Sequence, residues 1–137
     1  MAEVSYQVEE NIEVEEYKNV LIKSTLGKRR PIDDLDRIKK MCRNANLILT
    51  ARIGNKLVGI ARVLTDFTFS AYLADLAVDQ EYQRLGIEKK LIIEVKKECG
   101  GATVTLLAAP EAIEYYRKIG MSQYEYCFRL KDLQDLR

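Results

Sequence analysis

The spacing of apolar residues along this chain of 137 residues changes at about residue 46, and this change does most to set the predicted order of its elements. Between about residues 13 and 45, apolar residues recur every three or four positions, as they do on one face of a helix. From residue 46 they alternate or run together through three consecutive strands, after which helices and strands take turns. The predicted order is β-α-α-β-β-β-α-β-α-β, which is an α+β (mixed α/β) fold with helices on both faces of one sheet.

Ten secondary-structure elements are expected. They are a strand within 4–10, helices at about 13–25 and 32–45, a hairpin over 46–66 that turns at Gly54-Asn55, a strand at 71–79, a helix at 88–99, a strand at 102–109, a helix at 110–120 and a strand at 122–130. The unit 71–79, 88–99, 102–109 is predicted to be a right-handed crossover between parallel strands. Ligands lodge at the carboxyl ends of such strands, so a site is expected just after residue 79.

Length and composition limit the class of protein. The chain is long enough for one domain over residues 1–137. A formal net charge of +1 gives no general attraction to nucleic acid or to a membrane surface, and neither is expected as a partner. No apolar run approaches the ~18 residues that span a bilayer, and the acidic start at residues 1–17 has no secretory signal pattern. A cytoplasmic location is expected.

The sequence contains no histidine and only three cysteines, which are widely spaced. The absence of histidine excludes Ser–His and Cys–His nucleophilic mechanisms and His-ligated metals, and no metal is expected. Cys42, Cys99 and Cys127 are expected to be free thiols in a reducing compartment. Acid–base chemistry would therefore fall to Tyr, Asp, Glu, Lys or Cys side chains, or to water.

Positive charge gathers where the helix at 88–99 should begin. Arg84, Lys89 and Lys90 lie around a turn that contains Gly86, although a helix N-terminus already carries partial positive charge. A bound anion would account for this, because the N–H groups of such a turn converge and Gly86 allows close approach. The other interpretation is a plain strand–helix connection with solvated lysines. Neither a Walker A loop nor a GxGxxG fingerprint is present.

Two stretches resemble the GCN5-related N-acetyltransferase (GNAT) superfamily. "QRLGIE", residues 83–88, is similar to the family's pyrophosphate-binding motif [QR]-x-x-G-x-[GA], and it follows an apolar strand as that motif does. "LLAAPEAIEYYRKIGM", residues 106–121, resembles the family's helix with an aromatic–Tyr pair before Lys-x-Gly-[FM]. The resemblance implies a GNAT-like fold, with a mixed, mostly antiparallel sheet of about six to seven strands and four helices. Glu88 departs from the motif, which usually has a small residue there.

The resemblance implies acetyl-CoA as co-substrate and direct transfer of its acetyl group to a primary amine of a small molecule or a protein. Backbone groups of the strand would pair with the pantetheine arm, and N–H groups of the turn would bind the pyrophosphate. The implied strand residues are Leu76, Ala77 and Val78, and the implied turn residues are Gln83, Arg84, Leu85, Gly86, Ile87, Glu88 and Lys89. A backbone N–H near Leu76–Val78 would stabilise the oxyanion.

Three side chains are candidates for proton transfer. In the family, the tyrosine after an aromatic in the second stretch protonates the leaving thiolate, and Tyr116 holds that position here; simple packing is the alternative. The amine also needs a base. Asp75 is the one charge in the apolar strand at 71–79, so it is either a base or an anchor for neighbouring backbone. Tyr72 is the other candidate, and its odd separation from Asp75 predicts opposite faces of the sheet.

The sequence leaves two questions open: what the acceptor is, and whether the protein catalyses a reaction. Lys28, Arg29 and Arg30 are either a site for an acceptor that carries a carboxylate or phosphate, or a solvated loop. A CoA-binding sensor or scaffold with weak or no catalysis is the alternative function, and Glu88 favours it. A homodimer through the last strand is a further expectation from the family.

Overall fold

The structure, a computed structural model, describes residues 3–137, and its elements follow the predicted order through the last helix. The strands are β1 (Ser5–Val8), β2 (Leu47–Ile53), β3 (Lys56–Thr65), β4 (Ser70–Val78) and β5 (Thr103–Thr105), and the α-helices are α1 (Val14–Lys23), α2 (Leu35–Asn44), α3 (Ile87–Cys99) and α4 (Ile113–Lys118). Short 3-10 turns lie at Leu26–Arg29, Gln80–Tyr82, Pro110–Ala112 and Leu133–Asp135. The chain divides into two compact units, Met1–Leu107 and Ala108–Arg137.

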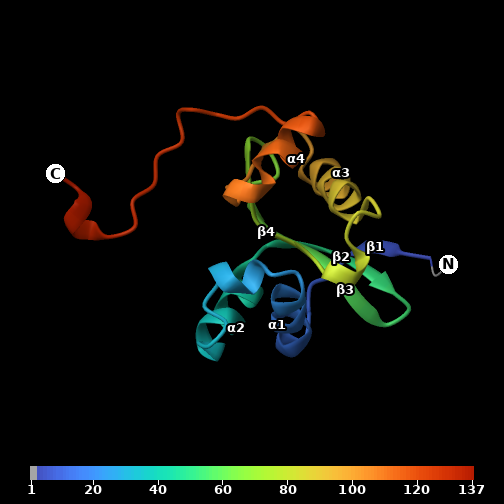
Figure 1. Cartoon of the computed structure of the whole chain (residues 1–137). Coiled ribbons are helices and arrows are strands. Elements are labelled where there is room, and N and C mark those ends of the chain that lie inside the picture. The colour runs from blue at the N-terminus through green and yellow to red at the C-terminus, as the bar shows by residue number, and fades with distance from the viewer. Residues whose placement is uncertain (1–2) are drawn as a thin grey trace. The chain divides into compact units, whose positions relative to one another are not determined.

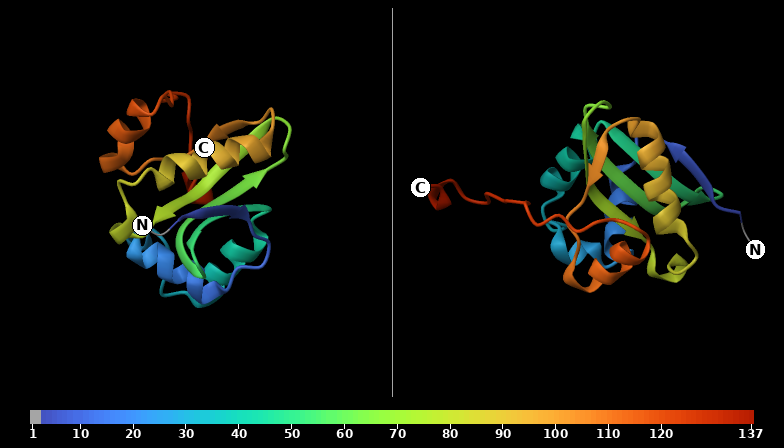
Figure 2. Two further views of the ribbon diagram at one scale, coloured as in Figure 1. Left: turned by 90° about the vertical axis from the view of Figure 1, so that its right-hand side faces the viewer. Right: turned by 90° about the horizontal axis from the view of Figure 1, so that it is seen from above.

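The first unit is a mixed sheet with helices on both faces. The strand order is β1-β2-β3-β4-β5; the first three pairings are antiparallel and β4–β5 is parallel. The α+β class and the parallel crossover through α3 are therefore confirmed. Helix α3 lies on one face of the sheet, while α1 and α2 lie on the other (Figures 1 and 2).

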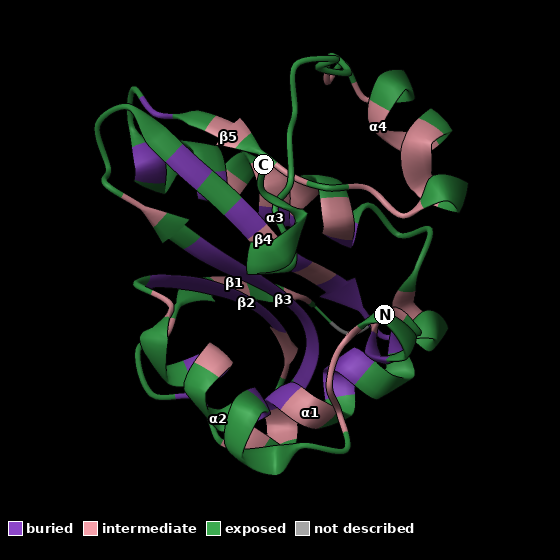
Figure 3. Cartoon of the chain, turned by 90° about the vertical axis from the view of Figure 1, so that its left-hand side faces the viewer, coloured by how far each residue is buried: buried purple, intermediate pink, exposed green. Residues whose placement is uncertain are grey.

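Each face of the sheet has its own apolar core. Ile87, Leu91 and Val95 of α3 are buried against one face, as the helical spacing of apolar residues requires. Tyr17 and Val20 of α1 are buried against the other face, together with residues of α2. The central strands β2 and β3 are almost continuously buried (Figure 3), because both of their faces are covered.

The prediction of a last strand at 122–130 is wrong for the described structure, and so is the count of six to seven strands. The sheet of residues 3–137 has five strands, and β5 covers three residues rather than 102–109. The alternation of polar and apolar residues over 122–130 is typical of a strand, but a strand also needs a partner edge for its N–H and C=O groups. Several apolar side chains of this segment are exposed, Phe128 to 91%.

An ion cluster joins β1, β2 and α1 at one side of the sheet. The Arg52 guanidinium lies 2.7 Å from Glu9 and 2.8 Å from Glu16, and Thr50 donates a hydrogen bond to Glu9. The hydrogen bond from Arg52 is the main reason that the pKa of the Glu9 carboxyl falls to about 2. The side chains of Arg52 and Glu9 are 13% and 18% exposed, so solvent screens this pair only weakly.

Acid should unfold the protein partly through Glu9. Its pKa is 4.5 ordinarily and about 2 in the folded state, so the stability it contributes is complete above about pH 4.5 and is lost as pH falls toward 2. We expect Glu9→Gln to lower the free energy of unfolding at pH 7 and to weaken its decline between pH 4.5 and 2. Urea titrations followed by circular dichroism measure both. Glu98→Gln, at an exposed position on α3, should leave the decline unchanged; an equal change in both variants would contradict the role of Glu9.

Candidate active site

A β-bulge in β4 decides which side chains of this strand face which helices. Arg62 of β3 is opposite Asp75 and Val63 is opposite Leu73, so Ala74 is the extra residue. Before the bulge, Leu73 packs toward α3; after it, Asp75 lies on the side of α1 and α2. The expectation that Tyr72 and Asp75 lie on opposite faces is therefore wrong, because the inserted residue shifts the alternation by one.

The carboxyl-terminal half of β4 has a free edge. The Asp79 N–H donates to the Val58 carbonyl at 2.9 Å, so alternate residues before it, including Ala77, also direct their backbone groups to β3. The backbone N–H and C=O groups of Leu76 and Val78 consequently point the other way. The pairing of β4 with β5 covers only Ser70–Tyr72, so these groups face a gap in the sheet of the first unit.

The turn after β4 is held by its own side chains. The Asp79 carboxylate accepts a hydrogen bond from the Glu81 N–H at 3.0 Å. The Gln83 amide donates to the Val78 carbonyl at 2.8 Å, so Gln83 ties the turn to the end of the strand. Arg84 (φ 66°) and Gly86 (φ 83°) then adopt left-handed conformations, which bend the chain into α3.

The N-terminus of α3 is open to solvent and is not capped by its own residues. Gly86 is the N-cap and supplies no side-chain hydrogen bond, and the place where a Cβ would project from it is empty within 4 Å. The exposed side chains around it include Arg84, Leu85 and Lys89, while Ile87 is anchored in the core. Free N–H groups of a helix start beside two cations are what an anion such as a diphosphate requires.

Glu88, in the first turn of α3, is half-buried. One of its carboxylate oxygens is buried without a hydrogen-bond partner among the described residues, and burial raises the pKa of the carboxyl. Burial and the charge of Glu88 both raise the pKa of the Tyr6 phenol on β1, and that ring also lies 5.8 Å from the Lys90 ammonium. The Glu88 carboxylate therefore lies close enough to Tyr6 of β1 to affect the pKa of that phenol, and it also accepts a hydrogen bond from the backbone N–H of Glu88 in the first turn of α3.

Asp75 is the centre of a buried ion cluster. Its side chain has no exposed area, and both oxygens are bound: Arg30 Nε lies 2.7 Å from Oδ1, and Arg62 Nε lies 2.6 Å from Oδ2. Tyr17 also donates its hydroxyl to Oδ2. Burial raises the pKa of the Asp75 carboxyl, but the hydrogen bond and charge of Arg62, with Tyr17 and Arg30, outweigh it and hold the pKa below its ordinary value.

These contacts bear on two alternatives that the sequence left open. The carboxylate of Asp75 is occupied by three donors, which favours the anchoring role over that of a base. Of the three cations in the α1–α2 connection, Arg30 is committed to Asp75 and to the Ala74 carbonyl, at 2.7 Å each. Lys28 and Arg29 are exposed, and Arg30 is partly so.

Two members of the Asp75 cluster, Arg62 and Tyr17, were not predicted from the sequence. Arg62 is the one charge inside the buried run of β3, which is the same signal that marked Asp75. Tyr17 holds a buried position on α1, and its hydroxyl needs a partner there. The bulge places Asp75 on the same face as Arg62 and Tyr17, and it gives no signal in the spacing of apolar residues.

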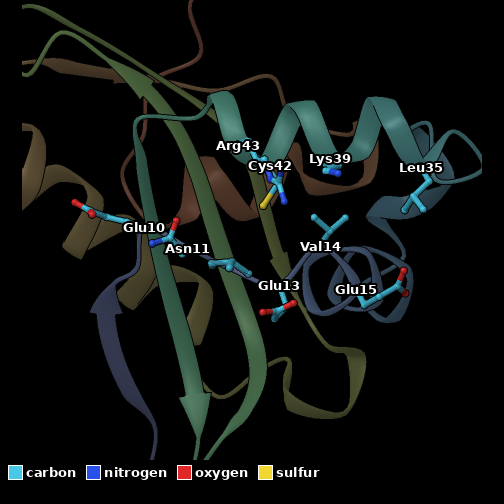
Figure 4. Close-up of a pocket in the computed structure, with 10 residues that line it drawn as sticks. Glu10, Asn11, Glu13, Val14, Glu15, Leu35, Lys39, Cys42 and Arg43 are labelled. Atoms are coloured by element: carbon cyan, nitrogen blue, oxygen red, sulfur yellow. The ribbon is translucent and has the colours of Figure 1, made fainter.

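A separate pocket of about 590 Å³ lies between α1 and α2. Figure 4 shows Val14 and Cys42 pointing into the space between the two helices, with carboxylates such as Glu13 and Glu15 on one side and Lys39 on the other. Cys42 is buried, and burial raises the pKa of its thiol, so it is not an activated nucleophile. The pocket involves none of the residues expected to bind CoA.

The second unit contains Tyr116. Its ring and that of Tyr115 meet edge to face in α4, with centroids 5.4 Å apart. Arg117 lies 2.5 Å from Glu114 and donates a further hydrogen bond to Gln123. The predicted helix at 110–120 is confirmed as a 3-10 turn that runs into α4 and ends at Gly120, whose φ is 100°.

Within residues 3–137, no set of three or more His, Cys, Asp or Glu side chains is arranged to hold a metal ion. Over the same range, every helix is too short or too polar to cross a bilayer.

Comparison with known proteins gives a family match over most of the chain. The sequence model of the family "Acetyltransferase (GNAT) domain" matches residues 9–128. An uncharacterised N-acetyltransferase, ycf52, of Pyropia yezoensis is 30% identical over 93 residues, which are 63% of this chain and 53% of that protein. A histone acetyltransferase of Glycine max is 34% identical over 70 residues, 47% of this chain and 29% of its own length. The chain thus spans about half the length, or less, of these relatives.

Solved structures agree on the fold. A GNAT-family acetyltransferase from Streptococcus pneumoniae TIGR4 superposes with a TM-score of 0.72 at 20% identity, over 96% of this chain and 98% of the other. An aminoglycoside N-acetyltransferase in complex with CoA gives a TM-score of 0.73 at 13% identity, over 97% of each chain. At these identities the likeness shows the fold, and the GNAT-like fold expected from the sequence is confirmed.

Replacing Glu88 should stabilise the protein at neutral pH. A carboxyl whose pKa is raised by folding contributes fully only below its ordinary pKa of 4.5, and stability is lost as pH rises through the raised value. The helix dipole favours a carboxylate here by ~0.3–1 kcal/mol, but the raised pKa shows that burial outweighs it. We expect Glu88→Gln to raise the melting temperature at pH 7 and to have less effect at pH 4. A lower melting temperature at pH 7 would contradict this account of Glu88, and Glu98→Gln on the same helix is the control.

Proposed function

Because the chain belongs to the GNAT acetyltransferase family, we propose that it transfers an acetyl group from acetyl-CoA directly to a primary amine of a small molecule or a protein. One observation carries the proposal: the free edge of β4 leads directly into the uncapped start of α3 at Gly86. An extended arm joined to a diphosphate, as the pantetheine arm of CoA is, matches such a strand edge followed by an anion site.

The residues of the first unit fit CoA in two parts. The pantetheine arm, which carries amide groups, would pair with the backbone N–H and C=O of Leu76 and with the N–H of Val78, since the Val78 carbonyl already accepts a hydrogen bond from Gln83. Its diphosphate would accept hydrogen bonds from the N–H groups of the first turn of α3, with Arg84 and Lys89 as exposed cations nearby. The Glu88 carboxylate accepts a hydrogen bond from its own backbone N–H, so a diphosphate would have to replace it there or bind the other N–H groups of this turn. Ala77 would contribute through packing, since its backbone faces β3.

The proposed reaction needs no acyl-enzyme. The amine nitrogen attacks the thioester carbonyl carbon, a C–N bond forms, and the C–S bond breaks as CoA leaves as a thiolate. A backbone N–H at Leu76 or Val78 would donate to the oxygen on which negative charge develops, and one such donor is typically worth ~3 kcal/mol. The thiolate takes up one proton, for which Tyr116 is the proposed donor on the basis of the family resemblance.

The attacking amine must also lose a proton. Tyr72 is a candidate for relaying it, because its side chain is 37% exposed and lies on the same face of β4 as Asp75. Asp75 is the weaker candidate, since both of its oxygens are held by donors. We propose that its main contribution is to hold the strand.

For the acceptor, the cellular location and the oligomeric state, the proposals are less specific. A histone acetyltransferase and an aminoglycoside N-acetyltransferase are among the proteins this chain is similar to, so protein and small-molecule amines both stay open. Lys28 and Arg29 remain available to an acceptor that carries an anionic group. Free thiols at Cys42, Cys99 and Cys127 support a reducing location such as the cytoplasm. A homodimer through residues 122–130 stays a proposal.

A CoA-binding sensor or scaffold without turnover is the second candidate. The departure at Glu88 favours it, because a carboxylate in the motif can lower the affinity for a diphosphate when the side chain moves. Tyr116 in a matching helix favours catalysis.

Cofactor binding and turnover can be separated in one series of measurements. Millimolar acetyl-CoA should raise the melting temperature of the protein, since a ligand that binds only the folded state stabilises it. A panel of amines assayed for thiol release should then reveal turnover that Tyr116→Phe reduces at least tenfold. Binding without turnover across the panel would favour the sensor, whereas no shift in melting temperature would remove both candidates.

Two glycines allow a matched test of the anion site. Gly86 (φ 83°) and Gly54 (φ 60°) both have left-handed backbones and empty space where a Cβ would project, so alanine should cost ~1–2 kcal/mol of stability at either position. Only Gly86→Ala should weaken acetyl-CoA binding, by about tenfold, because charge-assisted hydrogen bonds are worth ~1.5–3 kcal/mol. Isothermal titration calorimetry measures the affinity. Equal affinities of the two variants would place the diphosphate elsewhere.

A further inference from the structure

Arg30 makes contacts that a solvated loop cation does not make. It follows the 3-10 turn at Leu26–Arg29 in the α1–α2 connection, and its guanidinium reaches β4, 44 and 45 residues away in the sequence. Nε donates to Asp75 Oδ1 and Nη2 donates to the Ala74 carbonyl, both at 2.7 Å, while Nη1 donates to the carbonyl of Arg29 at 2.9 Å. One side chain thus binds the bulged residue, the residue after it and its own loop.

The hydrogen bonds from Arg30 matter most at the bulge of β4. Ala74 has no partner residue on β3, so the ladder that holds the rest of β4 is interrupted there. Just before it, the other edge of β4 loses β5, because the parallel pairing stops at Tyr72. The carbonyl of Ala74 is fixed by Arg30, and Asp75 is fixed by Arg30 and Arg62 from two sides.

We propose that Arg30 is a positioning residue for acetyl transfer: it fastens the α1–α2 connection to the bulge of β4 and so fixes the strand edge, at Leu76 and Val78, that receives the thioester. This inference rests on the proposed function and adds to it. The same contact fixes the α1–α2 connection, which carries Lys28 and Arg29, beside the strand. Arg30 touches neither co-substrate and acts through Ala74 and Asp75.

Lysine cannot replace arginine in this contact. The two bonds to β4 leave the guanidinium from different nitrogens and end on two acceptors, a carboxylate oxygen and a peptide carbonyl. The planar fork of arginine spans such a pair, whereas an ammonium is a compact point charge. Removing Arg30 does not leave Asp75 as a lone buried charge, since Arg62 and Tyr17 still bind it, and the variants should therefore fold.

The chain offers a matched control on the same face of the sheet. Arg52 is also a largely buried arginine held by carboxylates, but it binds Glu9 and Glu16 beside β1 and β2 and makes no contact with β4. Arg52→Lys should therefore reproduce the loss of a buried forked ion pair without disturbing the bulge.

The test compares Arg30→Lys, Arg30→Ala and Arg52→Lys with the full-length wild-type protein. Steady-state thiol release should show kcat reduced by ~10- to 100-fold in the Arg30 variants, because a misplacement of about 1 Å can cost 10²-fold, with KM for acetyl-CoA changed less than threefold. Millimolar ethylguanidinium should restore part of the kcat of Arg30→Ala. Amide hydrogen exchange by NMR at Asp75 and Ala77, whose N–H groups face β3, should accelerate in the Arg30 variants and not in Arg52→Lys.

The outcomes separate this inference from the proposed function. Unchanged amide exchange at Asp75 and Ala77 in both Arg30 variants would overturn the positioning role, whatever the activity. Equal losses of kcat in Arg52→Lys would also overturn it, since general destabilisation would then suffice. If the wild-type protein shows no turnover, the proposed function fails while the exchange data still decide whether Arg30 holds the strand.

Discussion

The buried carboxylate of Asp75 is the interaction on which the arrangement of the first unit depends. It lies just after the bulge of β4, and it joins that strand to β3 through Arg62, to α1 through Tyr17 and to the α1–α2 connection through Arg30. A buried charge without partners would be strongly unfavourable, so these elements can meet only in the arrangement that satisfies it. The face of the sheet that carries α1 and α2 is therefore positioned by charge as well as by apolar packing.

One face of β4 and one edge of β4 have different roles. Toward α1 and α2 the strand is closed by the Asp75 cluster, while at its edge the backbone of Leu76 and Val78 faces a gap where β5 has already separated. Gln83 binds the last carbonyl of the strand, so the edge and the turn around Gly86 form one continuous surface. The long, extended co-substrate that we propose for this chain would need both parts held at a fixed distance.

Much of this could be predicted from the sequence because local signals carried it. Helical spacing predicted the helices at about 13–25 and 88–99, and the glycine after an apolar strand identified the turn at Gly86. The bulge at Ala74 could not be read, since a single extra residue leaves the apolar character of the strand intact and reverses only the faces beyond it. The pairing of Arg30 with Asp75 also gave no signal, because the two residues meet only in the folded chain. The alternation over residues 122–130 predicted a strand, but strand pairing depends on the fold as well as on this spacing. In the described structure these residues belong to no strand.

The Asp75 cluster also restricts how this sequence can change over generations. Replacing Asp75 alone would leave two arginines facing each other, and replacing Arg62 alone would leave a poorly compensated carboxylate in the interior. Substitutions that are each harmful alone can be tolerated together, since residues of one network have strongly non-additive effects. Natural variants of this chain should therefore keep all the residues of the Asp75 cluster or replace them together.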